Sequence, residues 1–205
     1  MRPETVDLLL MGRLGRPYRF VAECESTQRL LGEDEPEGTT VATDHQTAGR
    51  GRLGRVWEDE PGRGLLFSVL LRPTIHMAIW PELSLVAGEA VAAALPIDAR
   101  VSHPNDVMVA GRKIAGILPE ATAGGGKYRP GAGGLAGGAS SLSTGWVRLG
   151  IGINVNQTTA ELPEDTVKPT TSLRIETGHE LERAPLLAAI LLELETRYAA
   201  WQKRD

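Results

Sequence analysis

Residues 49–55 read Gly-Arg-Gly-Arg-Leu-Gly-Arg, which places three guanidinium groups on a segment with three glycines and no acidic residue. This positive charge stands out because the chain carries a formal net charge of -4. Glycines let a backbone approach a ligand closely, and the planar guanidinium group of arginine matches phosphate and carboxylate oxygens. The segment therefore predicts a loop that closes over an anionic ligand.

Further polar clusters interrupt the apolar stretches of the chain, at residues 25–28, 45–48, 104–106, 112–113 and 154. Each of them, taken alone, has a structural explanation: Ser26 can cap a helix, and Asn105-Asp106 can form a turn. Arg112-Lys113 opens an apolar run that is expected to be a strand, and a strand holds a charge more rigidly than a loop does.

Hydrophobic periodicity predicts the elements that must position these groups. Strands are expected at residues 18–22, 39–43, 64–71, 100–102, 107–109, 113–118 and 146–153. Helices are expected at residues 6–11, 26–31, 81–95 and 184–201. Single helices spaced among more numerous strands predict an α+β fold, with a mixed or antiparallel sheet and helices packed on one of its faces.

The composition limits the class of protein. Hydrophobic residues make up 41% and charged residues 23% of the 205 residues, which is typical of one soluble globular domain spanning residues 1–205. The net acidic charge argues against a general nucleic-acid binder. The single cysteine, Cys24, fits a reducing compartment. Because neither a signal peptide nor a run of about 20 apolar residues is evident, we expect a cytoplasmic protein.

Residues 121–145 are rich in glycine, alanine and serine and show no hydrophobic periodicity. Such a composition predicts a flexible, solvated insertion between two strands. Pro119 supports this interpretation because proline cannot donate a hydrogen bond to a strand ladder.

Several common site signatures are absent or unconvincing. Residues 49–54 match the spelling of the dinucleotide-binding fingerprint, but no convincing helix starts there. The four histidines lack zinc-ligand spacing. Cys24 lies between two glutamates that would raise the pKa of its thiol, so a structural cysteine is favoured over a nucleophile.

Five ordered motifs together resemble the biotin protein ligases, also called biotin–[acetyl-CoA-carboxylase] ligases. They are EST at 25–27, QTAGRGRLGRVW at 46–57, PNDV at 104–107, GRKIAGIL at 111–118 and GIGINVN at 150–156. The resemblance covers about residues 18–201. It implies that biotin and MgATP form biotinyl-5′-adenylate and pyrophosphate. The lysine of a biotin carboxyl carrier domain, part of a biotin-dependent carboxylase, then takes the biotin.

The same resemblance assigns roles to individual residues. Lys113 and Arg50 are assigned to catalysis, and Asp106 to the magnesium ion. The residues assigned to biotin are Ser26, Thr27, Gln28, Gln46, Gly49, Arg50, Gly51, Arg52, Lys113 and Gly116. The residues assigned to the nucleotide are Arg52, Arg55, Trp57, Asn105, Asp106, Lys113 and Asn154. A carboxylate that attacks a phosphate brings two anions together, so the site must neutralise both.

The chain departs from the family pattern at three places. Ser102-His103 stands where the family has Lys-Trp, which removes one positive charge near the nucleotide. We expect neither an N-terminal helix-turn-helix domain nor the small C-terminal β domain. The insertion at residues 121–145 is longer than the usual hairpin turn.

Three rival functions remain open at this point. A lipoate or octanoate ligase or transferase shares the fold. A non-catalytic module could hold biotin or the carrier domain without turnover. An RNA-binding Arg-Gly segment is disfavoured by the acidic net charge and the lack of interleaved aromatic residues. The sequence does not distinguish a monomer from a homodimer.

Overall fold

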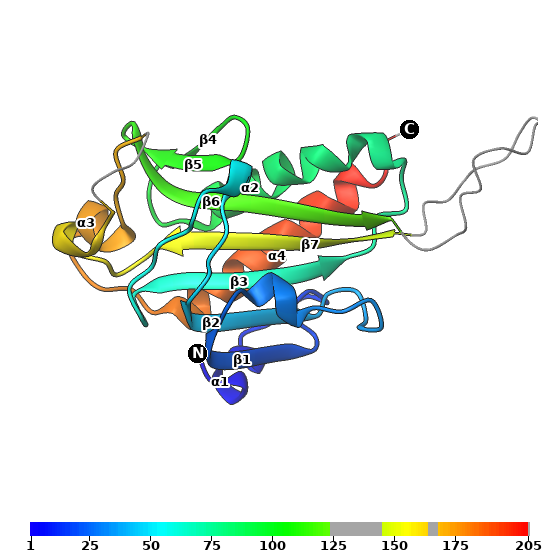
Figure 1. The fold of residues 1–205 in the computed structure, drawn as a ribbon, viewed down its shortest axis with the longest axis horizontal. Helices are drawn as coiled ribbons and strands as arrows, with labels where there is room; N and C mark the ends of the chain where they lie inside the picture. The colour runs from blue at the N-terminus through cyan, green and yellow to red at the C-terminus, as the bar shows by residue number, and fades with distance from the viewer. Residues whose placement is uncertain (124–144, 164–167, 205) are drawn as a thin grey trace, which may run out of the picture.

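A seven-stranded mixed sheet carries the helices of the protein in a computed structural model (Figure 1), which describes residues 1–123, 145–163 and 168–204. The strand order is β1-β2-β3-β7-β6-β5-β4, in which β1 and β2 are parallel and the other paired neighbours are antiparallel. The strands are β1 (Tyr18–Cys24), β2 (Thr40–Gln46), β3 (Gly64–Leu71), β4 (Arg100–Ser102), β5 (Asp106–Val109), β6 (Arg112–Ala123) and β7 (Gly145–Asn154).

Two long helices, α2 (Leu83–Ala94) and α4 (Arg183–Trp201), lie behind this sheet in Figure 1. Shorter helical segments are α1 (Pro3–Asp7), α3 (Leu173–Thr177) and the 3-10 turns η1 (Thr27–Leu30), η2 (Arg52–Gly54), η3 (Met77–Glu82) and η4 (Thr159–Glu161). The predicted α+β fold, with a mixed sheet and helices packed on one face, is therefore confirmed.

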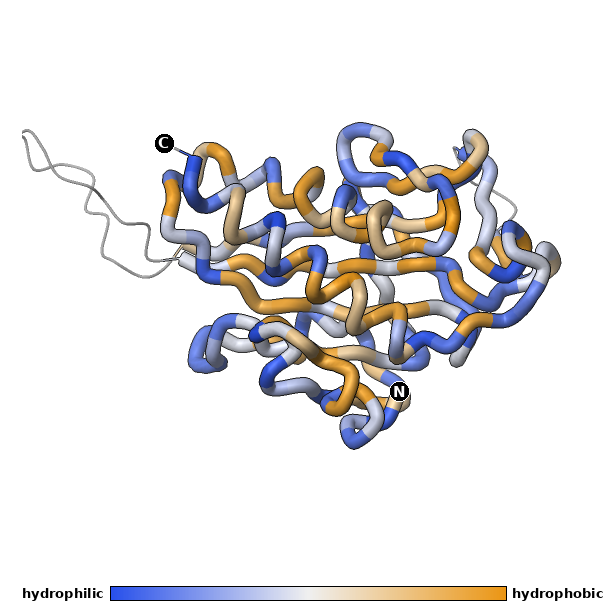
Figure 2. Tube along the Cα trace, turned by 180° about the vertical axis from the view of Figure 1, so that it is seen from behind, coloured by the Kyte–Doolittle hydropathy of each residue, from blue (hydrophilic) through white to orange (hydrophobic). Residues whose placement is uncertain are grey.

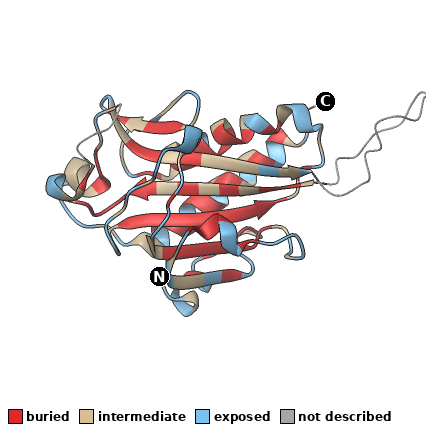
Figure 3. Ribbon diagram, viewed as in Figure 1, coloured by how far each residue is buried: buried red, intermediate tan, exposed pale blue. Residues whose placement is uncertain are grey.

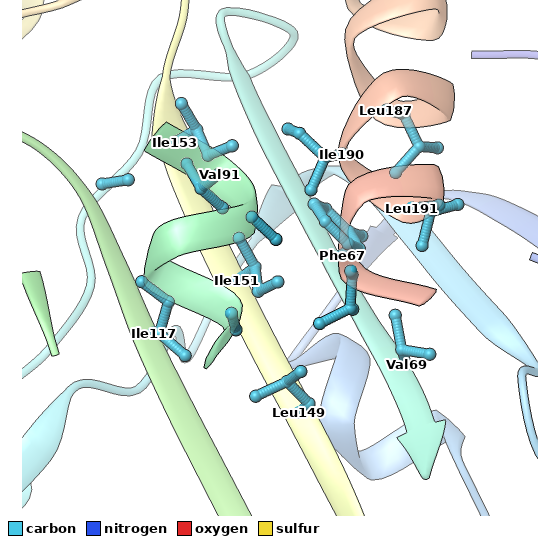
Figure 4. Packing of buried hydrophobic residues seen from close by; sticks show 14 of the residues in the cluster. Phe67, Val69, Val91, Ile117, Leu149, Ile151, Ile153, Leu187, Ile190 and Leu191 are labelled. Carbon is cyan, nitrogen blue, oxygen red and sulfur yellow. The ribbon is translucent and has the colours of Figure 1, made fainter. Parts of the chain in front are cut away.

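The main core lies between the sheet and these two helices. Figure 4 shows Phe67 of β3 and Ile151 of β7 beside Val91 of α2 and Ile190 of α4. Seen from the helix side, hydrophobic segments converge on the central strands and on α2 and α4 (Figure 2). Burial is greatest on the same central strands (Figure 3), and every residue of β3 is buried. Such a run suits a central strand that is covered on both faces.

Three of the predicted helices begin or end elsewhere. The helix expected at residues 6–11 is α1, Pro3–Asp7, because Pro3 supplies the fixed φ of a first turn. The segment at residues 26–31 forms only the 3-10 turn Thr27–Leu30. The helix expected from residue 81 is preceded by the 3-10 helix Met77–Glu82, and its α-helical part begins at Leu83.

The ends of the predicted insertion are strand residues. Residues 121–123 belong to β6 and residue 145 belongs to β7, so the prediction of a flexible segment is wrong there. The rest of the insertion, residues 124–144, lies outside the described residues. Pro119 lies inside β6, paired in register with Leu149. A proline is tolerated there because β5 pairs with β6 only as far as Gly116, which leaves that edge of β6 open.

The stretch Met77–Ala94 has a mean hydropathy of 1.2, enough by length and composition alone for a membrane span. This stretch was not predicted from the sequence as a possible membrane span. Its residues Leu83, Ala87, Ala90 and Val91 are buried in the main core against the sheet. The apolar composition of this stretch is therefore that of a core helix.

Candidate active site

A cavity of about 800 Å³ lies on the sheet face opposite α2 and α4, beneath the loop between β2 and β3. In Figure 1 this loop crosses in front of the sheet. Every residue that the resemblance assigns to catalysis, biotin or nucleotide lines this cavity, except Gly49. Segments far apart in the sequence, from Ser26 to Asn154, thus meet at one place.

Glycines form the floor of the cavity. Along β7, Ile151 and Ile153 are buried in the main core, while Gly150 and Gly152 line the cavity on the other face. This alternation follows from the two-residue period of a strand. The GIGIN motif therefore places isoleucine toward the helices and bare backbone toward a ligand.

Trp57 covers part of this floor. A Cβ atom added at Gly152 would lie 2.7 Å from Trp57 Cε2, and one added at Gly116 would lie 2.9 Å from Trp57 Cζ3. The two glycines are therefore what allows the indole ring to lie flat against β6 and β7. Lys113 Nζ lies 5.5 Å from the centroid of the same ring, a cation–π contact.

The loop at residues 49–57, which we call the lid, folds back on itself. Gly51 N donates to Arg55 O at 2.8 Å, and Trp57 N donates to Gly49 O at 3.0 Å. Gly49 is absent from the cavity lining because it serves this turn: a Cβ there would overlap the backbone oxygen of Trp57. The predicted contact of Gly49 with biotin stays a prediction, and in the structure Gly49 serves this turn of the lid.

The lid is tied to the sheet by its arginines. Arg50 Nη2 lies 2.7 Å from Glu120 Oε2 on β6, and Arg52 Nη1 donates to Asn105 Oδ1 at 3.5 Å. The tip carries the exposed Leu53, whose φ of 58° lies in the left-handed region. Both arginine contacts are solvent-accessible and therefore weak, so an anionic ligand can compete for these groups.

The chain just after the lid is anchored by the buried carboxylate of Asp59. Asp59 Oδ2 lies 3.0 Å from His45 Nδ1, and Gln46 N donates to the same oxygen at 3.4 Å. Burial raises the pKa of the Asp59 carboxyl above its ordinary value, while the His45 contact opposes that rise. This anchor helps to fix the backbone of Gln46, whose side chain lines the cavity.

One end of the cavity is a buried polar cluster. Gln46 Oε1 accepts from Thr27 N at 2.9 Å, and Thr27 Oγ1 lies 2.7 Å from Ser68 Oγ. Thr27 and Ser68 are buried hydroxyls that can rotate to donate or to accept. This end can therefore bind a neutral group that carries both N–H and C=O.

Gln28 also lines the cavity, but its amide is used within the fold. Its Nε2 donates to Leu118 O at 3.0 Å and to Arg148 O at 3.1 Å, which joins the end of η1 to β6 and β7. The geometry therefore assigns Gln28 to positioning the polar cluster, beside its predicted contact with biotin.

The other end of the cavity is charged. Lys113 Nζ lies 2.8 Å from Asp106 Oδ1, and Lys168 Nζ lies 2.8 Å from Asp106 Oδ2. Burial raises the pKa of Asp106, but the hydrogen bonds from the two lysines outweigh burial and hold that pKa below its ordinary value. At this end of the cavity, two ammonium groups from different segments therefore contact the two oxygens of one carboxylate.

Backbone contacts hold Lys113 in place. Lys113 N donates to Pro169 O at 2.7 Å, and Thr171 N donates to Lys113 O at 2.9 Å. Asn154, predicted to contact the nucleotide, donates from Nδ2 to Thr171 O at 3.0 Å. Asn154 therefore fixes the strand-like segment that in turn fixes the lysine.

A protein-held magnesium ion does not fit these residues. Both Asp106 oxygens face ammonium groups, and Asn105 Oδ1 accepts from Arg52. Across the described ranges, no group of three or more His, Cys, Asp or Glu side chains could hold a metal ion. Magnesium usually binds through one or two carboxylates together with substrate phosphates, so the described residues suit an ion that arrives with a nucleotide better than one held by the protein alone.

Several residues of the cavity were not predicted from the sequence. Lys168 carries no local motif and reaches Asp106 only through folding. Ser68 lies in an apolar strand, where a single polar residue among Leu, Phe and Val was the available signal. Gly150 and Gly152 belonged to a quoted motif, and the period of two along β7 could have identified their face.

This chain matches a family model and several known proteins. A family model described as Biotin/lipoate A/B protein ligase family matches residues 21–131. The Mycobacterium tuberculosis biotin–[acetyl-CoA-carboxylase] ligase is 32% identical over 212 residues, covering 97% of this chain and 70% of that protein. The chain belongs to the biotin protein ligase family.

Similarity to two further proteins supports membership of this family. The bifunctional ligase/repressor BirA of Bacillus spizizenii is 37% identical over 193 residues, which cover 90% of this chain. The chain spans about half of that relative's length, 54%. The structure of the Aquifex aeolicus biotin protein ligase in complex with biotin and ATP is 32% identical, with a TM-score of 0.72, and covers 91% of this chain and 72% of that one. The seven-stranded sheet with its helices is the catalytic fold of this family.

Proposed function

We propose that the protein is an ATP-dependent biotin protein ligase. The observation that carries this proposal is the position of Lys113. Its ammonium group lies 5.5 Å from the ring centroid of Trp57 above the glycine floor, and 2.8 Å from Asp106 at the charged end. One cation in the cavity therefore lies against both the Trp57 ring and the carboxylate at the charged end.

The first step joins two anions. A biotin carboxylate oxygen attacks the α-phosphorus of ATP, and the bond from that phosphorus to the bridging oxygen breaks, which releases pyrophosphate. Lys113 lowers the repulsion between the two groups and stabilises the charge that develops on the phosphate. The lid arginines add charge once the substrates are bound, and the covered cavity keeps water from the adenylate.

The second step transfers biotin to a protein. The ε-amine of a lysine on a biotin carboxyl carrier domain attacks the carbonyl carbon of the mixed anhydride, and AMP leaves. The partner is therefore a folded domain that must present its lysine at the mouth of the cavity. Magnesium enters bound to ATP as part of the substrate.

The polar cluster favours biotin over lipoate. The ureido ring of biotin carries N–H and C=O groups that Thr27, Ser68 and Gln46 can satisfy, whereas the dithiolane ring of lipoate carries neither. A site built for hydrogen bonds rejects an analogue that lacks them. We expect biotin to raise the melting temperature in a thermal-shift assay and lipoate at equal concentration to leave it unchanged. A larger rise with lipoate would support the lipoate ligase alternative.

We expect biotin and ATP together to protect the lid from trypsin. Cleavage after Arg52 and Arg55 should slow by at least about tenfold, because lid opening is suppressed when a ligand binds the closed state. Mass spectrometry of the fragments measures this rate, and cleavage after the exposed Lys203 serves as the internal control. Equal cleavage of the lid in both states would contradict the role of the lid.

A further inference from the structure

Glu120 lies on β6 beside the lid, just outside the cavity. Gly116 and Leu118 of the same strand line the cavity, so the two-residue period of β6 turns Glu120 to the same face of the sheet. Glu120 Oε2 lies 2.7 Å from Arg50 Nη2. The side chain of Glu120 is 25% exposed and that of Arg50 is 38% exposed, so the contact is partly shielded from water. This ion pair joins the lid to a strand that is fixed in the sheet.

A cross-strand ion pair would be the simplest role for a glutamate at this position. In the register of the sheet, Glu120 stands opposite Arg148 of β7, where opposite charges stabilise neighbouring strands. Arg148 is used elsewhere: its Cζ lies 4.8 Å from the ring centroid of Trp146, and its Nη1 donates to Gln28 O at 3.4 Å. Within the described residues, Arg50 is the only ion-pair partner of Glu120. Glu120 therefore serves the lid rather than the pairing of the strands.

Arg50 keeps hydrogen-bond donors for a ligand while it contacts Glu120. A guanidinium group carries five N–H donors, and the contact with Glu120 uses only Nη2. In the part of the chain that the structure describes, Nε and Nη1 of Arg50 have no hydrogen-bond partner. Arg50 also lines the cavity. An anion in the cavity can therefore bind this guanidinium without displacing Glu120.

We propose that Glu120 is a positioning residue, which holds the Arg50 side chain at the cavity wall for the anion that the lid covers. This inference rests on the proposed function, in which that anion is the biotin carboxylate. A long side chain that is mobile in water loses rotamer freedom when it binds a ligand. Because Glu120 already holds the guanidinium, part of this loss is met before biotin binds. A partly exposed ion pair is also weak enough to let the lid open.

The first test compares Glu120→Gln with the wild type. Without ligand, trypsin should cleave the variant after Arg52 and Arg55 about 2- to 10-fold faster, because the lid has lost its ion pair to β6. Biotin should bind about 2- to 10-fold more weakly in calorimetric titration, the effect of ordering one long side chain on binding. The melting temperature should stay close to that of the wild type. Glu23→Gln, at an exposed glutamate of β1 with no ion pair in the described ranges, should match the wild type in all three measurements.

A charge-reversal variant separates positioning from a structural role. Arg50→Glu/Glu120→Arg keeps an ion pair between the lid and β6, so cleavage after Arg52 and Arg55 should return to the wild-type rate. Biotin affinity should not recover, because the carboxylate introduced at residue 50 repels the carboxylate of biotin. A pair that only ties the lid to the sheet would recover both properties.

Two outcomes would overturn the proposal. One is cleavage of the Glu120→Gln lid at the wild-type rate. The other is recovery of biotin affinity together with the cleavage rate in the charge-reversal variant. The cleavage rate is measured without biotin and without turnover. It therefore tests the hold of Glu120 on the lid even if the wild type binds no biotin, a result that would contradict the proposed function alone.

Discussion

Lys113→Ala is expected to slow biotinyl-adenylate formation by about 100- to 1,000-fold, the range found when one group that stabilises developing charge is removed. Lys113 Nζ is the cation that lies between the glycine floor and Asp106, so its loss leaves the two reacting anions facing each other. Biotin-dependent pyrophosphate release measures the rate. The lysine is half-buried at the cavity wall, and its side chain carries none of the core packing.

Two controls separate chemistry from folding in that experiment. The far-UV circular dichroism and melting temperature of Lys113→Ala should stay close to those of the wild type. Lys203→Ala removes a lysine outside the cavity and should release pyrophosphate at the normal rate. Near-normal release by Lys113→Ala would contradict the role assigned to Lys113.

Gly152→Ala is expected to weaken biotin binding by about 10- to 100-fold, because an extra methyl group in a packed site costs about 1–3 kcal/mol. A Cβ atom at this position would lie 2.7 Å from Trp57 Cε2, closer than real Cβ contacts allow. Since β7 is fixed between β3 and β6, the indole ring must move, and the lid that carries it moves as well. Calorimetric titration with biotin measures the affinity.

Gly32→Ala is the matched control because a Cβ atom at Gly32 would meet no heavy atom within 4 Å, and its φ is not in the left-handed region. This variant should bind biotin as the wild type does. If Gly152→Ala also bound biotin normally, the glycine floor would have no role in binding.

Local patterns predicted most strands because each is a short apolar run with its own boundaries, as at Gly64–Leu71. The order of the strands could not be predicted this way. The parallel pairing of β1 with β2, and the place of β7 between β3 and β6, depend on contacts between distant segments. Helix types were also missed where short segments formed 3-10 turns, because such turns share composition with an α-helix.

The candidate site also contains residues that could be predicted from the sequence and residues that could not. Lys113, Arg50 and Trp57 lie in motifs whose residues are close in sequence, and the structure brings these residues to one cavity. Lys168 could not be found, because it meets Asp106 only after the segment carrying residues 169–171 pairs with Lys113. Gly49 was assigned to biotin by the family resemblance, and that contact stays a prediction. The sequence could not show that Gly49 lies against the backbone oxygen of Trp57, because this turn forms only on folding.

We propose that this cavity activates biotin with ATP. The most direct test is to incubate the wild-type protein with biotin and with ATP labelled on the α-phosphate, and to quantify labelled biotinyl-adenylate and pyrophosphate. A parallel reaction with lipoate in place of biotin is the control. We expect adenylate formation that depends on biotin and is at least about a hundredfold faster than with lipoate. Release of pyrophosphate that does not depend on biotin, or the absence of any labelled adenylate, would contradict the claim.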